Sequence, residues 1–280
     1  MKIISKGKVL NSAEFYKKKQ RRRRIKLALL FIGLISLLSL LIYLSRYEQF
    51  LIAEVRVPGE EVIDKDKIVS RVESLLSGYY LWIIPRANAL FYPKHTIEDS
   101  LLVEFPRFKS VDLSLSEIQT LIVTVEEREP FALYCVGTPE CFFVDEEGLI
   151  FALAPSFSGA VYFIYTTESP IESPLGQKFL SVEEFKKLSR FMDTLEILDI
   201  YPVSLKVGDD EYSLSLPNLP AGRQGGGEIM WRKDSNLDLV YSNLEAFLSD
   251  DSIRVQENFL EKILYLDLRT DNKVFYKFKD

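Results

Sequence analysis

The sequence has few of the side chains that most often carry out catalysis or bind transition metals. Its 280 residues include one histidine, His95, and two cysteines, Cys135 and Cys141. A structural zinc site takes four ligands, mainly Cys and His, so these three residues cannot complete one without help from carboxylates. We therefore expect no metal and no cofactor. We interpret His95 as a surface residue rather than a member of a Ser-His-Asp triad, because no nucleophile-elbow motif accompanies it.

Motifs that bind phosphate or calcium are also missing. The glycine-rich run at 221–227 is followed by Glu228 and a strand pattern, whereas a phosphate-binding loop continues into Lys-Ser or Lys-Thr and a helix. The acidic runs at 145–147 and 209–211 lack the alternate spacing of a calcium loop and are predicted to be solvated turns. These absences favour a binding or scaffolding protein over an enzyme.

The charge of the chain changes sign along its length. The first 26 residues hold eleven of the 35 basic residues and one of the 41 acidic residues, a net charge of +10. The remainder holds 24 basic and 40 acidic residues, a net charge of −16. Between the basic tail and the acidic remainder, residues 27–44 carry no charge and no proline.

This uncharged run predicts a membrane anchor. A helix needs ~20 apolar residues to cross the hydrocarbon core of a bilayer, so we expect a transmembrane helix at 25–45. The basic tail at 1–24 should stay in the cytoplasm and contact anionic lipid, with the rest of the chain outside. The alternative is a cleaved signal peptide, but such apolar cores run ~7–15 residues and end at small residues, whereas Tyr43 and Arg46 stand here.

The two cysteines fall in the expected external part, where disulfides can form. They flank a turn-like Val-Gly-Thr-Pro-Glu loop with apolar residues on either side, which predicts a hairpin. We expect a disulfide between Cys135 and Cys141, and two free thiols are the alternative.

Two external domains are expected, because some 235 residues exceed the ~100–150 of a usual single domain. The first, at 50–129, has the order strand, helix, helix, strand, strand. Its predicted helices begin near Asp64 and Thr96, and a linker that contains Trp82 and Pro85 joins them.

The second domain, at 130–280, is predicted to be mostly antiparallel β structure with two helices. A capping box at 181–184 begins one helix, and Ser235 is expected to cap the other. A flexible inserted loop is expected at 217–227, and the hairpin 263–278 closes the domain. The fold class is therefore α+β, with an N-terminal transmembrane helix, a small β-α-α-β-β domain and a larger β domain.

Four motifs, in this order, carry a resemblance to a known family. The first motif looks like a POTRA (polypeptide-transport-associated) domain and consists of the runs 55–59 (Val-Arg-Val-Pro-Gly) and 78–81 (Gly-Tyr-Tyr-Leu), then Phe105-Pro106 before an alternating strand. The run 125–132 (Val-Glu-Glu-Arg-Glu-Pro-Phe-Ala) is similar to the domain junction of the bacterial division proteins called FtsQ or DivIB. The runs 143–151 and 265–272 resemble the next hairpin and the C-terminal Asp-Leu-Arg-Tyr-Asp motif of that family. The chain departs from the family pattern at Thr270 and Lys273 and in the glycine-rich loop.

The resemblance implies a non-enzymatic scaffold of the divisome, located at the division septum of the bacterial cytoplasmic membrane. Such a scaffold binds FtsB/FtsL-type single-pass coiled-coil proteins through its external domain, and other divisome membrane proteins through its POTRA-like domain. The binding mode is strand addition near the C-terminus. The matching positions are Arg269, Thr270, Asp271, Asn272, Val274, Phe275, Tyr276 and Phe278.

Strand alternation places Phe275 on the opposite face from Val274, Tyr276 and Phe278. The sequence leaves open which face packs on the core and which meets the partner. It also leaves open whether the external face is periplasmic or extracellular. The alternative function is a POTRA-bearing translocation or outer-membrane assembly component, and an anchored hydrolase of envelope polymers is a third hypothesis.

Overall fold

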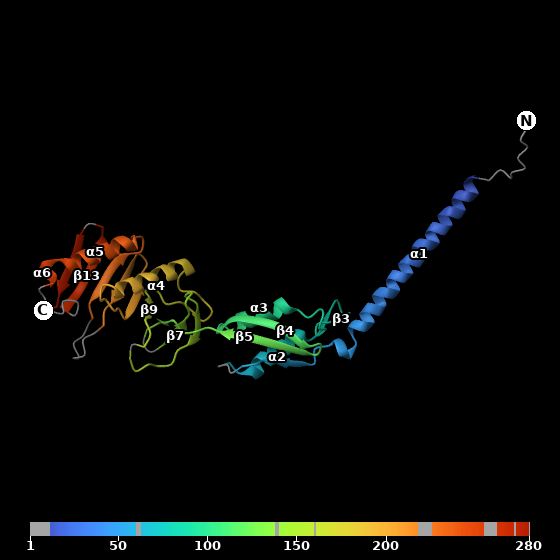
Figure 1. Ribbon diagram of the computed structural model, residues 1–280, viewed down its shortest axis with the longest axis horizontal. Coiled ribbons are helices and arrows are strands. Elements are labelled where there is room, and N and C mark those ends of the chain that lie inside the picture. The colour runs from blue at the N-terminus through green and yellow to red at the C-terminus, as the bar shows by residue number, and fades with distance from the viewer. Residues whose placement is uncertain are drawn as a thin grey trace, which may run out of the picture. The chain divides into compact units, whose positions relative to one another are not determined.

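A computed structural model describes residues 12–59, 63–137, 140–159, 161–217, 226–254, 262–271 and 273–279. The fold is α+β, as expected, and divides into two compact units, the first of which begins with a long apolar helix (Figure 1). The first unit comprises 1–101 and 111–125, and the second comprises 102–110 and 126–280.

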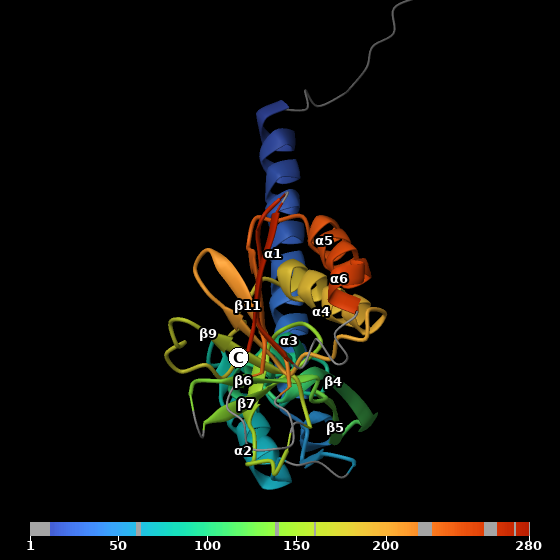
Figure 2. The ribbon, with the colours of Figure 1, turned by 90° about the vertical axis from the view of Figure 1, so that its left-hand side faces the viewer.

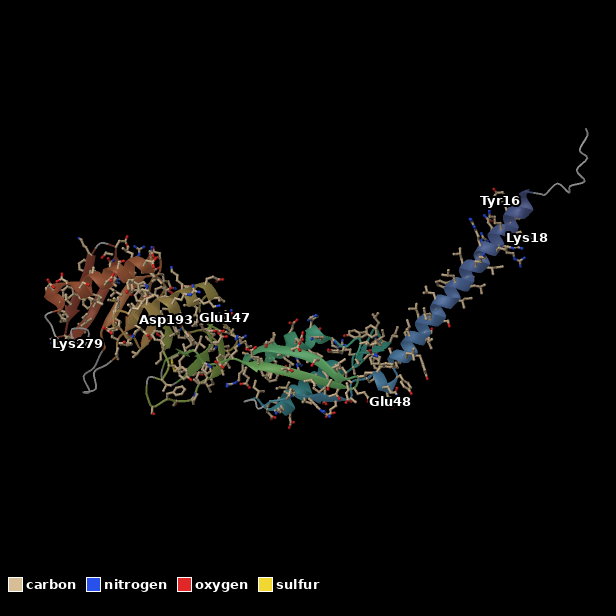
Figure 3. The ribbon with its side chains drawn as sticks, viewed as in Figure 1. Tyr16, Lys18, Glu48, Glu147, Asp193 and Lys279 are labelled. Carbon is tan, nitrogen blue, oxygen red and sulfur yellow. A yellow bond between two sulfur atoms is a disulfide. The ribbon has the colours of Figure 1, made fainter. Side chains whose placement is uncertain are left out.

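Helix α1 (Ser12–Ser45) contains the predicted anchor. Its part Tyr16–Ser45 is long and apolar enough to cross a membrane, and none of its most apolar stretch is buried by protein. Figure 3 labels Tyr16 and Lys18 in its first turns and Glu48 just beyond its end. The apolar run 27–44 spans about 27 Å at the rise of an α-helix, which is close to the thickness of a hydrocarbon core.

The first unit packs two helices with a three-stranded sheet. The sheet has the order β1 (Glu54–Arg56), β5 (Thr120–Glu127), β4 (Phe108–Glu117), and β1 runs parallel to β5. The helices are α2 (Lys65–Leu76) and α3 (Lys94–Glu104). The core consists of apolar side chains at helical and strand spacing: Ile68, Val72, Leu76, Ile97, Leu101, Leu113, Leu121 and Val123.

Two expectations for this unit need correction. The segment with Trp82 and Pro85 is a small antiparallel hairpin, β2 (Tyr79–Tyr80) with β3 (Ile84–Pro85), rather than a linker. Helix α3 begins two residues before Thr96, although it ends ahead of Pro106 as predicted. Asp64 caps α2 by accepting a hydrogen bond from the Asp66 amide.

The described part of the second unit forms one nine-stranded mixed sheet, in which most strand pairs are antiparallel, as expected. Its order is β14-β13-β12-β11-β10-β9-β6-β7-β8, and three of the eight strand pairs are parallel (β12 with β13, β9 with β10, β6 with β9). The strands are β6 (Ala132–Cys135), β7 (Cys141–Val144), β8 (Ile150–Leu153), β9 (Ile164–Thr167), β10 (Ser204–Val207), β11 (Glu211–Ser215), β12 (Glu228–Arg232), β13 (Ile263–Thr270) and β14 (Lys273–Phe278).

Helices α4 (Val182–Glu196) and α5 (Leu237–Ser249) cover one face of this sheet (Figure 2). Ser181 caps α4 by accepting from the Glu184 amide, which confirms the predicted helix start. Asn236, not Ser235, caps α5, because its side chain accepts from the Asp238 amide. A third, short helix, α6 (Asp251–Arg254), was not predicted.

One row of paired residues runs across all nine strands on the helix-covered face. From edge to edge it is Tyr276, Leu266, Ile229, Leu214, Leu205, Tyr165, Tyr134, Phe142 and Leu153. Every member between the two edge residues is at most 5% exposed. This continuous apolar row, buried under α4 and α5, forms the centre of the core.

The cysteines stand opposite each other at the end of the β6–β7 hairpin. Cys135 pairs with Cys141 in the strand register, and the structure joins them in a disulfide with 4.1 Å between the Cα atoms. The enclosed loop is short, so the crosslink should stabilise the fold only modestly: a ~15-residue loop contributes ~3 kcal/mol and shorter loops contribute less.

We predict that Gly148→Ala destabilises the second unit by about 2 kcal/mol. Gly148 has φ +79°, and an added Cβ would lie 3.0 Å from Cγ of Phe185, which is fully buried. Gly137→Ala is the matched control, since φ is +99° there but nothing lies within 4 Å. Chemical denaturation of both variants in a Trp82→Phe background, where fluorescence comes from Trp231 alone, would measure both losses. Equal losses in the two variants would contradict the role of the Phe185 contact.

Candidate functional site at the last strand

Strand β14 is the open edge of the nine-stranded sheet. The opposite edge, β8, is partly covered, because the Ile150 amide donates to the Gln177 carbonyl (2.9 Å) and the Gly176 amide donates to the Ile150 carbonyl (2.7 Å). On the outer side of β14, no strand within the described ranges makes such a pairing. An unpaired row of backbone donors and acceptors is a template for an incoming strand.

The packing of α5 decides which face of β14 belongs to the core. Val274 and Phe278 pack against the core, and the Tyr276 ring lies 5.1 Å from the Phe247 ring of α5. Phe275 points to the other face and is 51% exposed. The alternation expected from the sequence therefore holds, although Tyr276, at the edge of the helix-covered face, is itself 45% exposed.

The backbone of β14 alternates in the same way. The Lys279 amide donates to the Lys262 carbonyl at 2.7 Å, so Lys279 points its backbone groups toward β13. Every second residue of a strand does the same, and the residues between them point away. The free edge is therefore formed by the backbone groups of Val274, Tyr276 and Phe278.

A groove of ≈ 490 Å³ runs beside this edge, between β14 and the helices α5 and α6. Its lining is mixed. The apolar side chains are Leu239, Ala246, Phe247, Ile253, Val274 and Tyr276, and the polar residues are Asn243, Asp250, Ser252 and Asp271. Asn243 donates from Nδ2 to the Asp271 carbonyl at 3.3 Å. The groove therefore places both apolar and polar side chains next to the unpaired backbone.

Arg269 is the centre of an ionic network on the opposite face. Its Nε and Nη2 donate to both carboxylate oxygens of Asp267 (2.9 and 2.6 Å), and its Nη1 donates to Glu211 Oε2 at 2.8 Å. These hydrogen bonds from Arg269 lower the pKa of Asp267 and raise the pKa of Arg269 itself. The network connects β13 to β11 across the intervening strand β12.

The structure gathers most of the predicted site residues into this hairpin. Thr270 Oγ1 donates to the Lys273 carbonyl at 2.8 Å and closes the turn, with Arg269 and Asp271 beside it. Asn272 lies outside the described residues. The sequence missed Asp267 as a site member and assigned Glu211 to a solvated turn. The alternation of Asp267 with Arg269 on one strand face was the available signal for the first of these.

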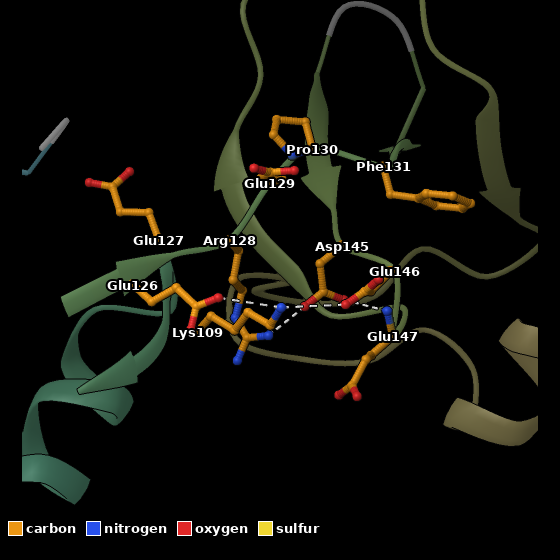
Figure 4. Close-up of a pocket in the computed structure, with 10 residues that line it drawn as sticks. All are labelled: Lys109, Glu126, Glu127, Arg128, Glu129, Pro130, Phe131, Asp145, Glu146 and Glu147. Carbon is orange, nitrogen blue, oxygen red and sulfur yellow. Dashed lines mark hydrogen bonds and ion pairs between the residues drawn. The ribbon is translucent and has the colours of Figure 1, made fainter. Parts of the chain in front are cut away.

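A second group of charged side chains surrounds the start of β6 (Figure 4). Arg128 donates from Nη1 to Asp145 Oδ2 and from Nε to the Pro106 carbonyl, while Asp145 Oδ1 accepts the amides of Glu147 and Leu149. The two side chains are only 17% and 6% exposed. They line a hollow of ≈ 580 Å³ with Lys109, which pairs with Glu126 and Glu146 at 3.5 Å each.

These contacts assign the Arg128–Asp145 pair a structural role. Asp145 Oδ1 holds the turn between β7 and β8 by accepting both amides, and Arg128 neutralises the carboxylate through Oδ2. The predicted solvated turn at 145–147 is therefore wrong for Asp145, which is buried. His95 lies on the surface with a 92% exposed side chain, and Nδ1 is 3.2 Å from Glu98 Oε2. Within the part of the chain that the structure describes, no cluster of three or more His, Cys, Asp or Glu side chains can hold a metal ion.

We predict that the Asp267–Arg269 contact stabilises the fold in a pH-dependent way. Because the folded-state pKa of Asp267 lies below its unfolded value, the contribution is present above about pH 4 and is lost as the pH falls through the folded-state pKa. The contact is partly exposed, so we expect less than about 1 kcal/mol. The difference in unfolding free energy between wild type and Asp267→Asn should shrink in acid. In an Arg269→Gln background this pH dependence should be smaller, because only the backbone amide of residue 269 still donates to Asp267 Oδ1, and an unchanged pH dependence there would contradict the assignment.

We further predict that Arg128→Met destabilises the second unit by about 3 kcal/mol, because it leaves the Asp145 carboxylate buried without its cation. Adding Asp145→Asn should recover part of that loss, because the buried charge is then removed. Denaturation of the four proteins of this double-mutant cycle would measure the coupling. A coupling free energy near zero would show that the pair is not a stabilising contact.

No protein-family model matches this chain, and no curated protein has a significantly similar sequence.

Proposed function

We propose that the chain is a non-enzymatic scaffold of the bacterial division machinery that binds FtsB/FtsL-type coiled-coil membrane proteins by strand addition to β14. The observation that carries the proposal is the open edge of β14, next to a groove of mixed apolar and polar lining, at the position of the C-terminal motif. An incoming strand would pair with the outward backbone groups of Val274, Tyr276 and Phe278. Its side chains would reach the groove on one face and Phe275 on the other.

The charges around the edge are consistent with this use. Lys273 and Lys277 are exposed on the same face as Phe275, and lysines on an edge strand disfavour self-pairing. An acidic partner segment would remove that barrier by pairing with them. The lysines on β14 can therefore discriminate between partners by charge, while the backbone groups of β14 supply the hydrogen bonds.

We propose that α1 crosses the cytoplasmic membrane once, with the basic tail inside and both units outside, at the septum. The length and apolarity of α1 and the charge asymmetry support this topology. We also propose that the first unit is POTRA-like and binds other divisome membrane proteins. Its support is the element order of the main sheet and helices, β1-α2-α3-β4-β5, and the pairing of β1 with β5.

The test separates the backbone of β14 from its side chains. Tyr276→Pro removes an outward amide without interrupting the ladder to β13, whereas Tyr276→Ala removes only the side chain. We predict that the proline variant of the full chain binds the external segments of the FtsB/FtsL-type proteins about tenfold more weakly than the alanine variant, since a lost hydrogen bond and a steric block add up to about 1.4 kcal/mol.

Titration calorimetry in detergent would measure this difference, with unfolding midpoints confirming that both variants fold. Equal affinities of the two variants would exclude strand addition at β14. Failure of the wild-type chain to bind would contradict the scaffold function with these partners.

A further inference from the structure

The turn of the β2–β3 hairpin exposes two large apolar side chains. Leu81 is 86% exposed and Trp82 is 92% exposed. The chain contains two tryptophans, and the other, Trp231, is fully buried in the second unit. Burial of Trp82 would remove a large apolar surface from water, so its exposure needs an explanation.

The backbone of this turn is also strained. Leu81 has φ +48° and Trp82 has φ +65°, and the Ile83 amide donates to the Tyr80 carbonyl at 2.9 Å. Two consecutive positive φ angles belong to a turn in which Asn and Gly are the usual residues. A bulky side chain in this conformation costs free energy, and such outliers cluster at functional positions.

The hairpin is attached to the end of α1. Arg46 donates from Nε to the Ile83 carbonyl at 2.9 Å and from Nη2 to the Trp82 carbonyl at 3.3 Å. Asn88, itself 1% exposed, donates from Nδ2 to the Ser45 carbonyl at 2.8 Å. Figure 1 shows β3 beside the end of α1. The turn is thus attached to Ser45 and Arg46, which directly follow Leu44, the last residue of the apolar run.

Further aromatic and basic side chains extend the exposed surface around this attachment. Tyr79 is 57% exposed, and the Arg46 guanidinium lies 5.8 Å from the centre of its ring. Leu90 and Phe91 are 75% and 55% exposed. Exposed arginines beside aromatic rings match a layer in which lipid phosphates lie next to the first acyl-chain carbons, where Trp and Tyr gather.

We propose that the β2–β3 turn docks in the interfacial layer of the bilayer that α1 enters, with Leu81 and Trp82 inserted among the headgroups and the outermost acyl carbons. The inference rests on the proposed membrane crossing of α1. A lipid surface is favoured over a protein partner because the hydrogen bonds from Arg46 and Asn88 fix the turn at the depth where the apolar run ends. The docked turn would give α1 and the start of the first unit a second point of attachment to the membrane.

The test measures the fluorescence of Trp82. The full chain and its Trp82→Phe variant are reconstituted into vesicles of phosphatidylcholine brominated either near the headgroup end or near the methyl end of the acyl chains. The difference between the two proteins isolates the emission of Trp82 from that of Trp231. Flotation of the vesicles on a density gradient shows separately whether the chain is anchored.

Interfacial docking predicts that Trp82 emission shifts to the blue and loses most of its intensity with the shallow bromines. Deep bromines should quench it weakly, and aqueous iodide should not reach it. A floating chain whose Trp82 is quenched by iodide and not by brominated lipid would overturn the docking while leaving the anchor intact. Strongest quenching by deep bromines would also overturn an interfacial position. A chain that does not float would overturn the proposed anchoring, and the docking with it.

Discussion

The row of apolar residues that crosses all nine strands is the contact on which the second unit depends. It gives α4 and α5 one continuous surface to cover, so the helices lie on the same face of the sheet. Each step of the row fixes the register of a neighbouring pair, because a slip of one residue would move its side chain to the other face. Burial of the inner residues therefore determines strand order, helix placement and the positions of the edges.

The two edge strands at the ends of this row differ in the backbone pairing that they make on their outer sides. Leu153 ends the row on β8, where the segment around Gln177 adds backbone pairing to part of the edge. Tyr276 ends it on β14, where the helix α5 supplies a ring contact but no described strand follows. The sheet is thus covered on one face, partly covered at one edge and open at the other. That asymmetry distinguishes β14 from the other strands and is the reason for proposing it as the binding surface.

Local patterns predicted most of the helices and strands, and long-range contacts account for the errors. The apolar run, the Ser181 cap and the alternation in β14 depend on neighbouring residues and were readable directly. The parallel strand pairs depend on crossovers between distant segments, and the sequence carries no signal for them. For the site, Glu211 and Arg269 are 58 residues apart and meet only because β11, β12 and β13 align. The face of β14 that packs on the core is the one that contacts Phe247, and Phe247 belongs to the distant helix α5.

Strand addition at β14, as proposed, would also set a stoichiometry at that edge. One open edge accepts one added strand, and the added strand then presents a new open edge of its own. Further strands would then add in turn, unless the length or charge of the incoming segment, or a helix that folds over it, blocks the next addition. A partner that joins β14 would therefore have to block further addition as well as bind, which would limit this edge to one partner strand and keep the assembly finite.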